Sequence, residues 1–159
     1  MRAEALEQAP AIAGRVVTAA DAPQGDAPPE GTPFEWLADA DSRLGPILEA
    51  IINGRYLWVP LQRVRRIDID APEDLRDMVW TPVHLVWENG GETLALVPTR
   101  YPGSEAVEDD ALRLARRTEW RELAPDQYAG LGQRMFATDA ADHALLEIRS
   151  IEFAAPAAE

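Results

Sequence analysis

The stretch PFEWLADADSRLGPILEAIINGRYLWVP, residues 33–60, decides how the fold and function of this chain are interpreted. It places two carboxylates, Asp39 and Asp41, just ahead of an apolar run. Such a pair can bind a hard divalent cation, but a calcium loop would continue with a ligand and then glycine, where this chain has Arg43 and Leu44. Near a helix start, a carboxylate instead accepts unpaired backbone N–H groups, which contributes about 1 kcal/mol. We therefore expect the pair to cap a helix or form a local turn.

A short helix is predicted directly after this pair. Its apolar residues follow the i, i+3, i+4, i+7, i+8 spacing of one helix face. They are Leu44, Ile47, Leu48, Ile51 and Ile52. Pro46 suits the first turn, and Asn53-Gly54 suits a left-handed helix end.

The rest of the chain is predicted to form strands. RYLWVP and RIDID read as strands joined by a bend at LQRVR, and Asn89-Gly90-Gly91 marks a tight hairpin within residues 81–101. APEDLRDMVW begins like a short helix, and further strands are expected within residues 112–123 and 133–153. The predicted class is α+β, with one main helix packed on a strongly bent, mainly antiparallel, partly barrel-like sheet of six to seven strands.

The predicted domain organisation has four parts. Residues 1–17 are expected to be a residual N-terminal helical segment. Residues 18–33, TAADAPQGDAPPEGTP, read as a flexible linker because they lack apolar periodicity. Residues 34–153 are expected to form a single β-rich domain, and residues 154–159 to form a tail.

Composition excludes several classes of function. The net charge of −13, from 28 acidic and 15 basic residues, repels phosphate backbones, so we expect no nucleic-acid partner. Every basic residue is arginine and cysteine is absent, which excludes lysine Schiff bases, phosphate-loop lysines and thiolate chemistry. No apolar run approaches a membrane span of about 18 residues, and no signal peptide is recognisable. We expect a cytoplasmic protein without a membrane contact or a cofactor.

Two kinds of site remain open. The first is a small metal-dependent hydrolase site using Asp39, Asp41 and His84, for which the carboxylate pair is the only support. The second is a partner-binding surface of arginine and aromatic side chains, which are enriched at interface hot spots. Its candidate residues are Arg63, Arg65, Arg66, Trp58, Arg100 and Tyr101. The alternative, which we favour for the arginines, is that they pair with the surplus acids on the surface.

Several stretches resemble the C-terminal region of the ImpE/TagJ (SciE-type) accessory proteins of bacterial type VI secretion. They are PFEWLADADSRLGPILEAIINGRYLWVPLQRVRRIDIDAPEDLRDMVW, NGGETLALVPTRYPGSE, LRLARRTEW and YAGLGQRMFATD. Together they cover most of residues 33–139.

This resemblance implies a non-enzymatic cytoplasmic helper. Its expected partners are the small subunit of the contractile sheath and, through it, the recycling ATPase ClpV. It implies neither a cofactor nor a catalytic residue. Such relatives carry helical repeats ahead of this region, so a purely architectural domain that stabilises those repeats is the remaining alternative.

Overall fold

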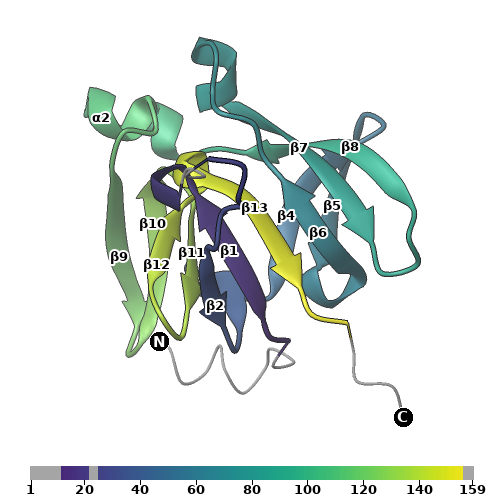
Figure 1. The fold of residues 1–159 in the computed structure, drawn as a ribbon. Coiled ribbons are helices and arrows are strands. Elements are labelled where there is room, and N and C mark those ends of the chain that lie inside the picture. Colours follow the sequence, from purple (N-terminus) through teal and green to yellow (C-terminus); the bar gives the residue numbers. More distant parts are fainter. Residues whose placement is uncertain (1–11, 22–24, 156–159) are drawn as a thin grey trace.

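The fold is built almost wholly from β-strands. We describe it from a computed structural model, which defines residues 12–21 and 25–155 (Figure 1). Strand makes up 50% of the structure and helix 14%, and the strands form three open sheets. Within the described ranges the α-helix is α2, Asp110–Arg113, with four residues. The predicted α+β class with one main helix on a partly barrel-like sheet is therefore wrong, and the protein is mostly β.

The largest sheet has eight strands in the order β2-β1-β13-β6-β7-β8-β4-β5. All of its neighbouring strands are antiparallel. The bounds are β1 (Gly14–Thr18), β2 (Thr32–Phe34), β4 (Ile47–Ile52), β5 (Arg55–Pro60), β6 (Val64–Asp68), β7 (Trp80–Trp87), β8 (Glu92–Pro98) and β13 (Ile148–Phe153). The two edges of this sheet are therefore β2 and β5.

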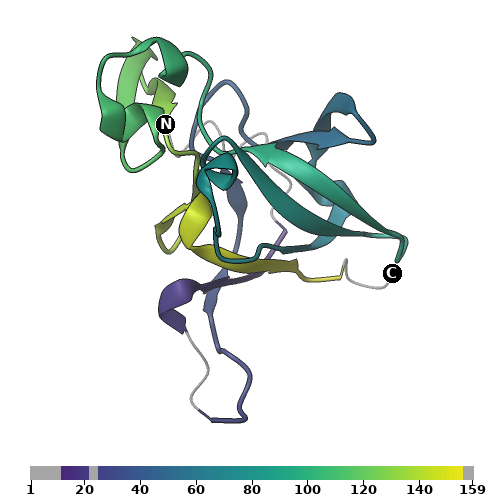
Figure 2. The same cartoon turned by 90° about the horizontal axis from the view of Figure 1, so that it is seen from above.

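Two smaller sheets complete the strand structure. One pairs β9 (Thr118–Ala124) with β10 (Gln127–Gly132), and the other has the order β12-β11-β3, with bounds Asp142–Ala144, Met135–Thr138 and Leu37–Asp39. Figure 1 shows β9 to β12 on one side of the molecule and β7 and β8 on the other. The view from above in Figure 2 separates the same two groups, with α2 beside β9 and β10.

Short 3-10 helices join many of the strands. They are η1 (Ala19–Asp21), η2 (Leu61–Arg63), η3 (Leu75–Met78), η4 (Ser104–Ala106) and η5 (Leu145–Glu147). The predicted bend between two strands is confirmed at η2, and the predicted short helical segment is confirmed as η3, which Asp74 caps. In the part of the chain that the structure describes, no helix is long and apolar enough to cross a membrane.

The predicted main helix is instead strand β4, which pairs with β5 along its whole length. Leu48, Ala50 and Ile52 point into the core and are at most 9% exposed, whereas Ile51 between them is less buried. In a run where nearly every residue is apolar, helical spacing and strand alternation fit equally well. The β-branched isoleucines favour the strand, and pairing with β5 and β8 decides between the two.

The residues expected to end that helix form the turn of the β4-β5 hairpin. Asn53 and Gly54 have φ of 52° and 75° and lie between the paired residues Ile52 and Arg55. Two successive left-handed residues are typical of a type I′ turn, whose twist matches that of the flanking strands. Asn53-Gly54 therefore forms the turn of a hairpin and not the end of a helix.

The hairpin predicted around Asn89-Gly90-Gly91 is confirmed. Strands β7 and β8 pair from Trp80 opposite Pro98 to Val86 opposite Glu92. Burial alternates along β7, so Val83 and Leu85 face the core while Pro82 and His84 face outward.

The first described strand belongs to the large sheet. Gly14–Thr18, which falls in the predicted segment 1–17 and the predicted linker 18–33, is strand β1 and pairs with both β13 and β2. Most of the segment predicted as an N-terminal helix, residues 1–11, lies outside the described residues. Strand β1, near the start of the described residues, is therefore held between β13 and β2.

The main core lies against the inner face of the eight-stranded sheet. It unites Val16 of β1, Ile67 of β6, Leu85 of β7 and Ile151 of β13 with Phe136 of the small three-stranded sheet, all at most 2% exposed. A second, smaller cluster is formed by Trp36, Ala38, Ala40 and Ala137. The main core therefore reaches from the large sheet into the small one.

We expect Gly54→Ala to lower the free energy of unfolding by about 1–2 kcal/mol, because a side chain is disfavoured in left-handed backbone. A Cβ at Gly54 would meet no atom within 4 Å, so the loss reports backbone conformation alone. Urea unfolding measures it. Asn53→Gly is the control and should change stability by less than about 0.5 kcal/mol. Equal losses in the two variants would contradict the assigned turn.

Candidate functional site

Asp39 lies in strand β3 and is 3% exposed. Its Oδ2 accepts a hydrogen bond from Nη1 of Arg134 at 2.5 Å. Its Oδ1 accepts from the Tyr101 hydroxyl at 2.7 Å and from the backbone N–H of Asp41 at 2.9 Å. The element directly after this pair is strand β4 and not a helix, so the predicted helix-capping role is wrong.

Asp41 forms the predicted local turn. Its carboxylate accepts bonds from the backbone N–H and the guanidinium of Arg43, and from the backbone N–H of Gly130 at 2.9 Å. Burial alone would raise the pKa of Asp41, but these donors outweigh it, so the pKa is lowered. Asp41 therefore connects the loop between β3 and β4 to strand β10.

The structure does not bring together the three residues of the predicted hydrolase site. His84 lies on β7, with its ring nitrogens 3.7 Å from Asp68 and 3.5 Å from Glu92. Asp39, in contrast, binds Arg134. In the described residues, no group of three or more histidine, cysteine, aspartate or glutamate side chains is placed to hold a metal ion.

Arg134 is the centre of a buried polar cluster. It is 0% exposed, and its guanidinium binds Asp39, the carboxylate of Glu49 and the backbone oxygen of Pro98, the last at 2.8 Å. The centre of the guanidinium also lies 5.0 Å from the centroid of the Tyr101 ring, which is a cation–π distance. One side chain thereby joins β3, β4 and the end of β8.

The charges in this cluster are unequal, because two carboxylates share one guanidinium. Burial raises the pKa of Asp39 to about 6, and the opposing effects of Arg134 and of the Asp41 and Tyr101 hydrogen bonds reduce the rise without cancelling it. Burial lowers the pKa of Arg134, but Asp39 and Glu49 more than offset it and the pKa is raised. Burial and the Asp39 carboxylate also raise the pKa of Tyr101. The cluster therefore keeps Arg134 charged.

The buried cluster reaches the surface through Glu49. The Tyr56 hydroxyl donates to the carboxylate of Glu49, and Nε1 of Trp58 donates to the same hydroxyl at 2.8 Å. Tyr56 is 55% exposed and Trp58 57% exposed. The two rings are thus held at the surface by hydrogen bonds that lead back to Arg134.

These rings belong to an exposed apolar surface, which we call the outer face. It is the side of β5, β4, β8 and β7 that points away from the core, as the pairing of Tyr56 with Ile51, Ile51 with Leu96 and Leu96 with Pro82 shows. Its exposed members are Tyr56 55%, Trp58 57%, Trp80 37%, Leu94 75% and Leu96 37%. Contiguous apolar exposure of this kind marks interaction sites.

Two shallow cavities lie along the outer face. One of about 290 Å³ is lined by Glu49, Tyr56, Trp80 and Arg100, among others. The other, of about 500 Å³, is lined by Ile51, Pro82, His84, Leu94 and Leu96 with neighbouring residues. The face therefore combines exposed rings with hollows into which a partner's side chains can fit.

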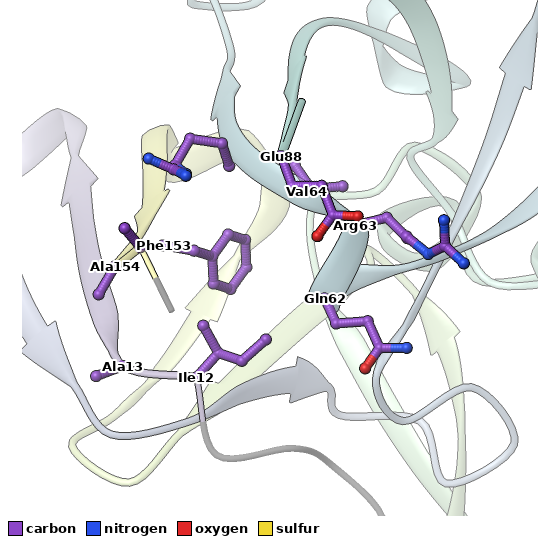
Figure 3. A pocket seen from close by; sticks show the side chains of 10 residues that line it. Ile12, Ala13, Gln62, Arg63, Val64, Glu88, Phe153 and Ala154 are labelled. Carbon is purple, nitrogen blue, oxygen red and sulfur yellow. The ribbon is translucent and has the colours of Figure 1, made fainter. Parts of the chain in front are cut away.

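The predicted partner-binding residues fall into separate places. Arg63 and Arg65 line a cavity of about 730 Å³ between the ends of β1, β6 and β13. Figure 3 shows Ile12 and Phe153 pointing into this cavity, while the guanidinium of Arg63 points away from them. Arg66 pairs with Asp68 at 2.8 Å and with Glu152 at 3.2 Å.

The other predicted residues gather at the outer face. Trp58 belongs to it and Arg100 lines its smaller cavity. Tyr101 lines the same cavity but is 1% exposed, and its hydroxyl binds Asp39. Tyr101 therefore supports this region from inside.

Sequence reasoning missed the residues that complete the outer face, chiefly Tyr56, Leu94 and Leu96. A signal was present, because both pairs Tyr56/Trp58 and Leu94/Leu96 have the spacing of two that puts side chains on one face of a strand. It also missed Arg134, whose partners lie far away in the sequence.

The chain is a small β-rich domain with an exposed apolar face. The sequence model of the ImpE protein family matches residues 31–152. The chain therefore belongs to the ImpE family, and the resemblance predicted from its sequence is confirmed.

Two similar proteins support this assignment at different levels. "Type VI secretion system accessory component TagJ" of Pseudomonas aeruginosa is 46% identical over 153 residues, which are 96% of this chain and 48% of that protein. The chain thus spans about half the length of that relative. The crystal structure of protein VPA1032 from Vibrio parahaemolyticus has a TM-score of 0.75 and 24% identity, covering 94% of this chain and 52% of that one. This second similarity concerns the fold alone.

We expect Arg134→Met to lower the free energy of unfolding by about 3–5 kcal/mol, because it leaves two buried carboxylates without their cation. Urea unfolding at neutral pH measures the loss. Arg66→Met is the matched control, since the Arg66 side chain is 43% exposed, and we expect a far smaller change. Similar losses in both variants would show that the buried cluster does not hold the sheets together.

The raised pKa of Asp39 predicts a pH-dependent stability. Because the folded carboxyl keeps its proton up to about pH 6 and the unfolded one up to about 3.8, Asp39 contributes stability below pH 3.8 that is lost as the pH rises through 6. The difference amounts to about 3 kcal/mol. We expect the wild type to lose stability relative to Asp39→Asn between pH 4 and 7. Carbon-13 NMR of the Asp39 carboxyl gives the pKa directly, and a value near 4 would contradict this.

Proposed function

We propose that this chain is a protein-binding domain of a bacterial type VI secretion system that carries out no chemistry of its own. We further propose that it acts in the cytoplasm, where it associates with the small subunit of the contractile sheath and, through that subunit, with the ATPase ClpV. Membership of the ImpE family and the 46% identity to an accessory component named TagJ support this role. The proposal covers this domain and makes no claim for the rest of its longer relative.

The observation that carries the proposal is the exposed apolar outer face. Tryptophan and tyrosine are, with arginine, enriched among interface hot spots, and Tyr56 and Trp58 are both more than half exposed. Their hydrogen bonds to Glu49 and to each other fix the rings before any partner arrives. A fixed ring loses less conformational entropy on binding than a free one.

The outer face is a better contact surface than the arginine cluster. Arg66 already pairs with two carboxylates, so a partner would have to compete with both. Arg63 and Arg65 lie beside a different cavity, away from the exposed rings. We therefore place Trp58 and Arg100 in the partner contact, with Tyr56 as a third member and Tyr101 beneath them.

We expect the double variant Tyr56→Ala/Trp58→Ala to capture the purified sheath small subunit at least about 10-fold more weakly than the wild type, because it removes two hot-spot side chains. Immobilised chain and titrated sheath subunit measure this. Leu75→Ala/Leu123→Ala is the matched control, since those side chains are 72% and 47% exposed but lie off the outer face.

A second variant separates the two candidate surfaces. Arg63→Glu/Arg65→Glu/Arg66→Glu should capture the sheath subunit as the wild type does. If this variant loses capture and the aromatic variant retains it, the contact lies at the arginine cluster. If the wild type captures neither the sheath subunit nor ClpV, the proposed partners are wrong.

A further inference from the structure

The middle of edge strand β5, residues 56–58, lacks the usual protection. This strand is the last strand of the eight-stranded sheet and pairs with β4 over six residues without a register shift. Its residues Arg55 to Trp58 are all exposed, and Leu57 is 37% exposed on the side opposite Tyr56 and Trp58. Natural edges are normally blocked by charged side chains, proline or bulges, and β5 carries such residues only at its ends, as Arg55 and Pro60.

The main-chain groups of β5 that face outward can be assigned from the hairpin. Arg55 lies opposite Ile52 next to the two-residue turn, and in such hairpins these two residues exchange hydrogen bonds. Alternation then turns the N–H and C=O groups of Leu57 toward β4 and those of Tyr56 and Trp58 outward. In the described structure, no main-chain partner is found for the outward groups of Tyr56 and Trp58.

We propose that β5 pairs with β5 of a second copy of this chain, antiparallel, about a two-fold axis at Leu57. This register places Tyr56 opposite Trp58 of the other copy and Leu57 opposite Leu57. The main-chain N–H and C=O groups of Tyr56 and Trp58 point outward, so each Tyr56–Trp58 pair across the axis exchanges two hydrogen bonds. The outward N–H groups of both residues are thereby satisfied in both copies. The proposal goes beyond the sheath contact and does not depend on it.

Neighbouring registers fit less well. An axis at Trp58 would place Tyr56 opposite Pro60, which has no N–H to donate. An axis at Tyr56 would place Trp58 opposite Gly54, which belongs to the turn. With the axis at Leu57, the charged Arg55 faces Val59 instead of another arginine, so no like charges are opposed along the strand.

The side chains of this register complement each other on both sides of the strand. On the outer face, Tyr56 and Trp58 form two aromatic cross-strand pairs, which are among the favourable pairs in sheets. On the other side, the two Leu57 side chains meet and lose their exposure. Each copy carries a net charge of −13, so the pairing is opposed by repulsion that salt screens. Added salt should therefore strengthen the dimer.

Sedimentation velocity of the full chain tests the proposal. We expect reversible dimerisation of the wild type at concentrations up to about 1 mM, shifted toward dimer by added sodium chloride. Leu57→Lys and Leu57→Glu should each be monomeric, because each places like charges directly opposite across the axis. An equimolar mixture of the two should dimerise again. Restoration in the mixture requires that residue 57 of one copy faces residue 57 of the other.

A second pair of variants tests the main-chain bonds. Trp58→Pro and Trp58→Thr both remove the ring, but only proline removes the outward N–H, and thermal unfolding confirms that each is folded. We expect Trp58→Thr to retain measurable dimer and Trp58→Pro to be monomeric. A wild type that stays monomeric, or Leu57 variants that dimerise like the wild type, would overturn the proposal. Hydrogen exchange gives a further check. If the amides of Tyr56 and Trp58 exchange more slowly only when the sheath subunit is added, β5 pairs with a strand of that subunit and not with a second copy.

Discussion

The buried guanidinium of Arg134 is the constraint on which the rest of the structure depends. A charged group with 0% exposure has no water to solvate it, so the protein must supply acceptors on every side. Asp39, Glu49 and the Pro98 oxygen do so from three different segments. Their positions fix how the small three-stranded sheet meets the start of β4 and the end of β8. The planar fork of arginine suits this role because it binds two carboxylates at once.

The same cluster prepares the surface above it. Glu49 shares its carboxylate between Arg134 inside and the Tyr56 hydroxyl outside, and that hydroxyl also accepts from Trp58. A buried ion pair and an exposed aromatic pair are thereby one hydrogen-bonded unit. Rings that are already oriented can bind a partner at lower entropic cost than freely rotating ones. The free energy needed to bury the Arg134 charge is thus linked to the orientation of Tyr56 and Trp58 on the outer face.

Sequence reasoning succeeded where structure is local and failed where it depends on distant residues. The hairpin at Asn89-Gly90-Gly91 was predictable because its turn residues lie between two alternating runs. The helix predicted over residues 44–52 is wrong, since the nearly continuous apolar residues satisfy both periods and only pairing with β5 and β8 selects the strand. The sequence predicts Asp39 as a helix cap or turn residue and not as an ion-pair partner, because Arg134 is 95 positions away and no local pattern connects them. The family resemblance was recognisable because it rests on long stretches of matching sequence.

The separation between Arg134 and its acid partners also shapes how the chain reaches its native state. Asp39 and Glu49 lie 95 and 85 positions away from Arg134 in the sequence. These ion pairs therefore form only after most of the polypeptide has folded. Topologies dominated by such remote pairings fold slowly, because loop-closure entropy must be overcome before the contacts form. The β4-β5 hairpin, in contrast, needs only neighbours in sequence and can assemble early. Strand β5, with its exposed aromatic residues, is therefore accessible to other chains before the core has packed. During this interval the newly made protein is most prone to aggregate.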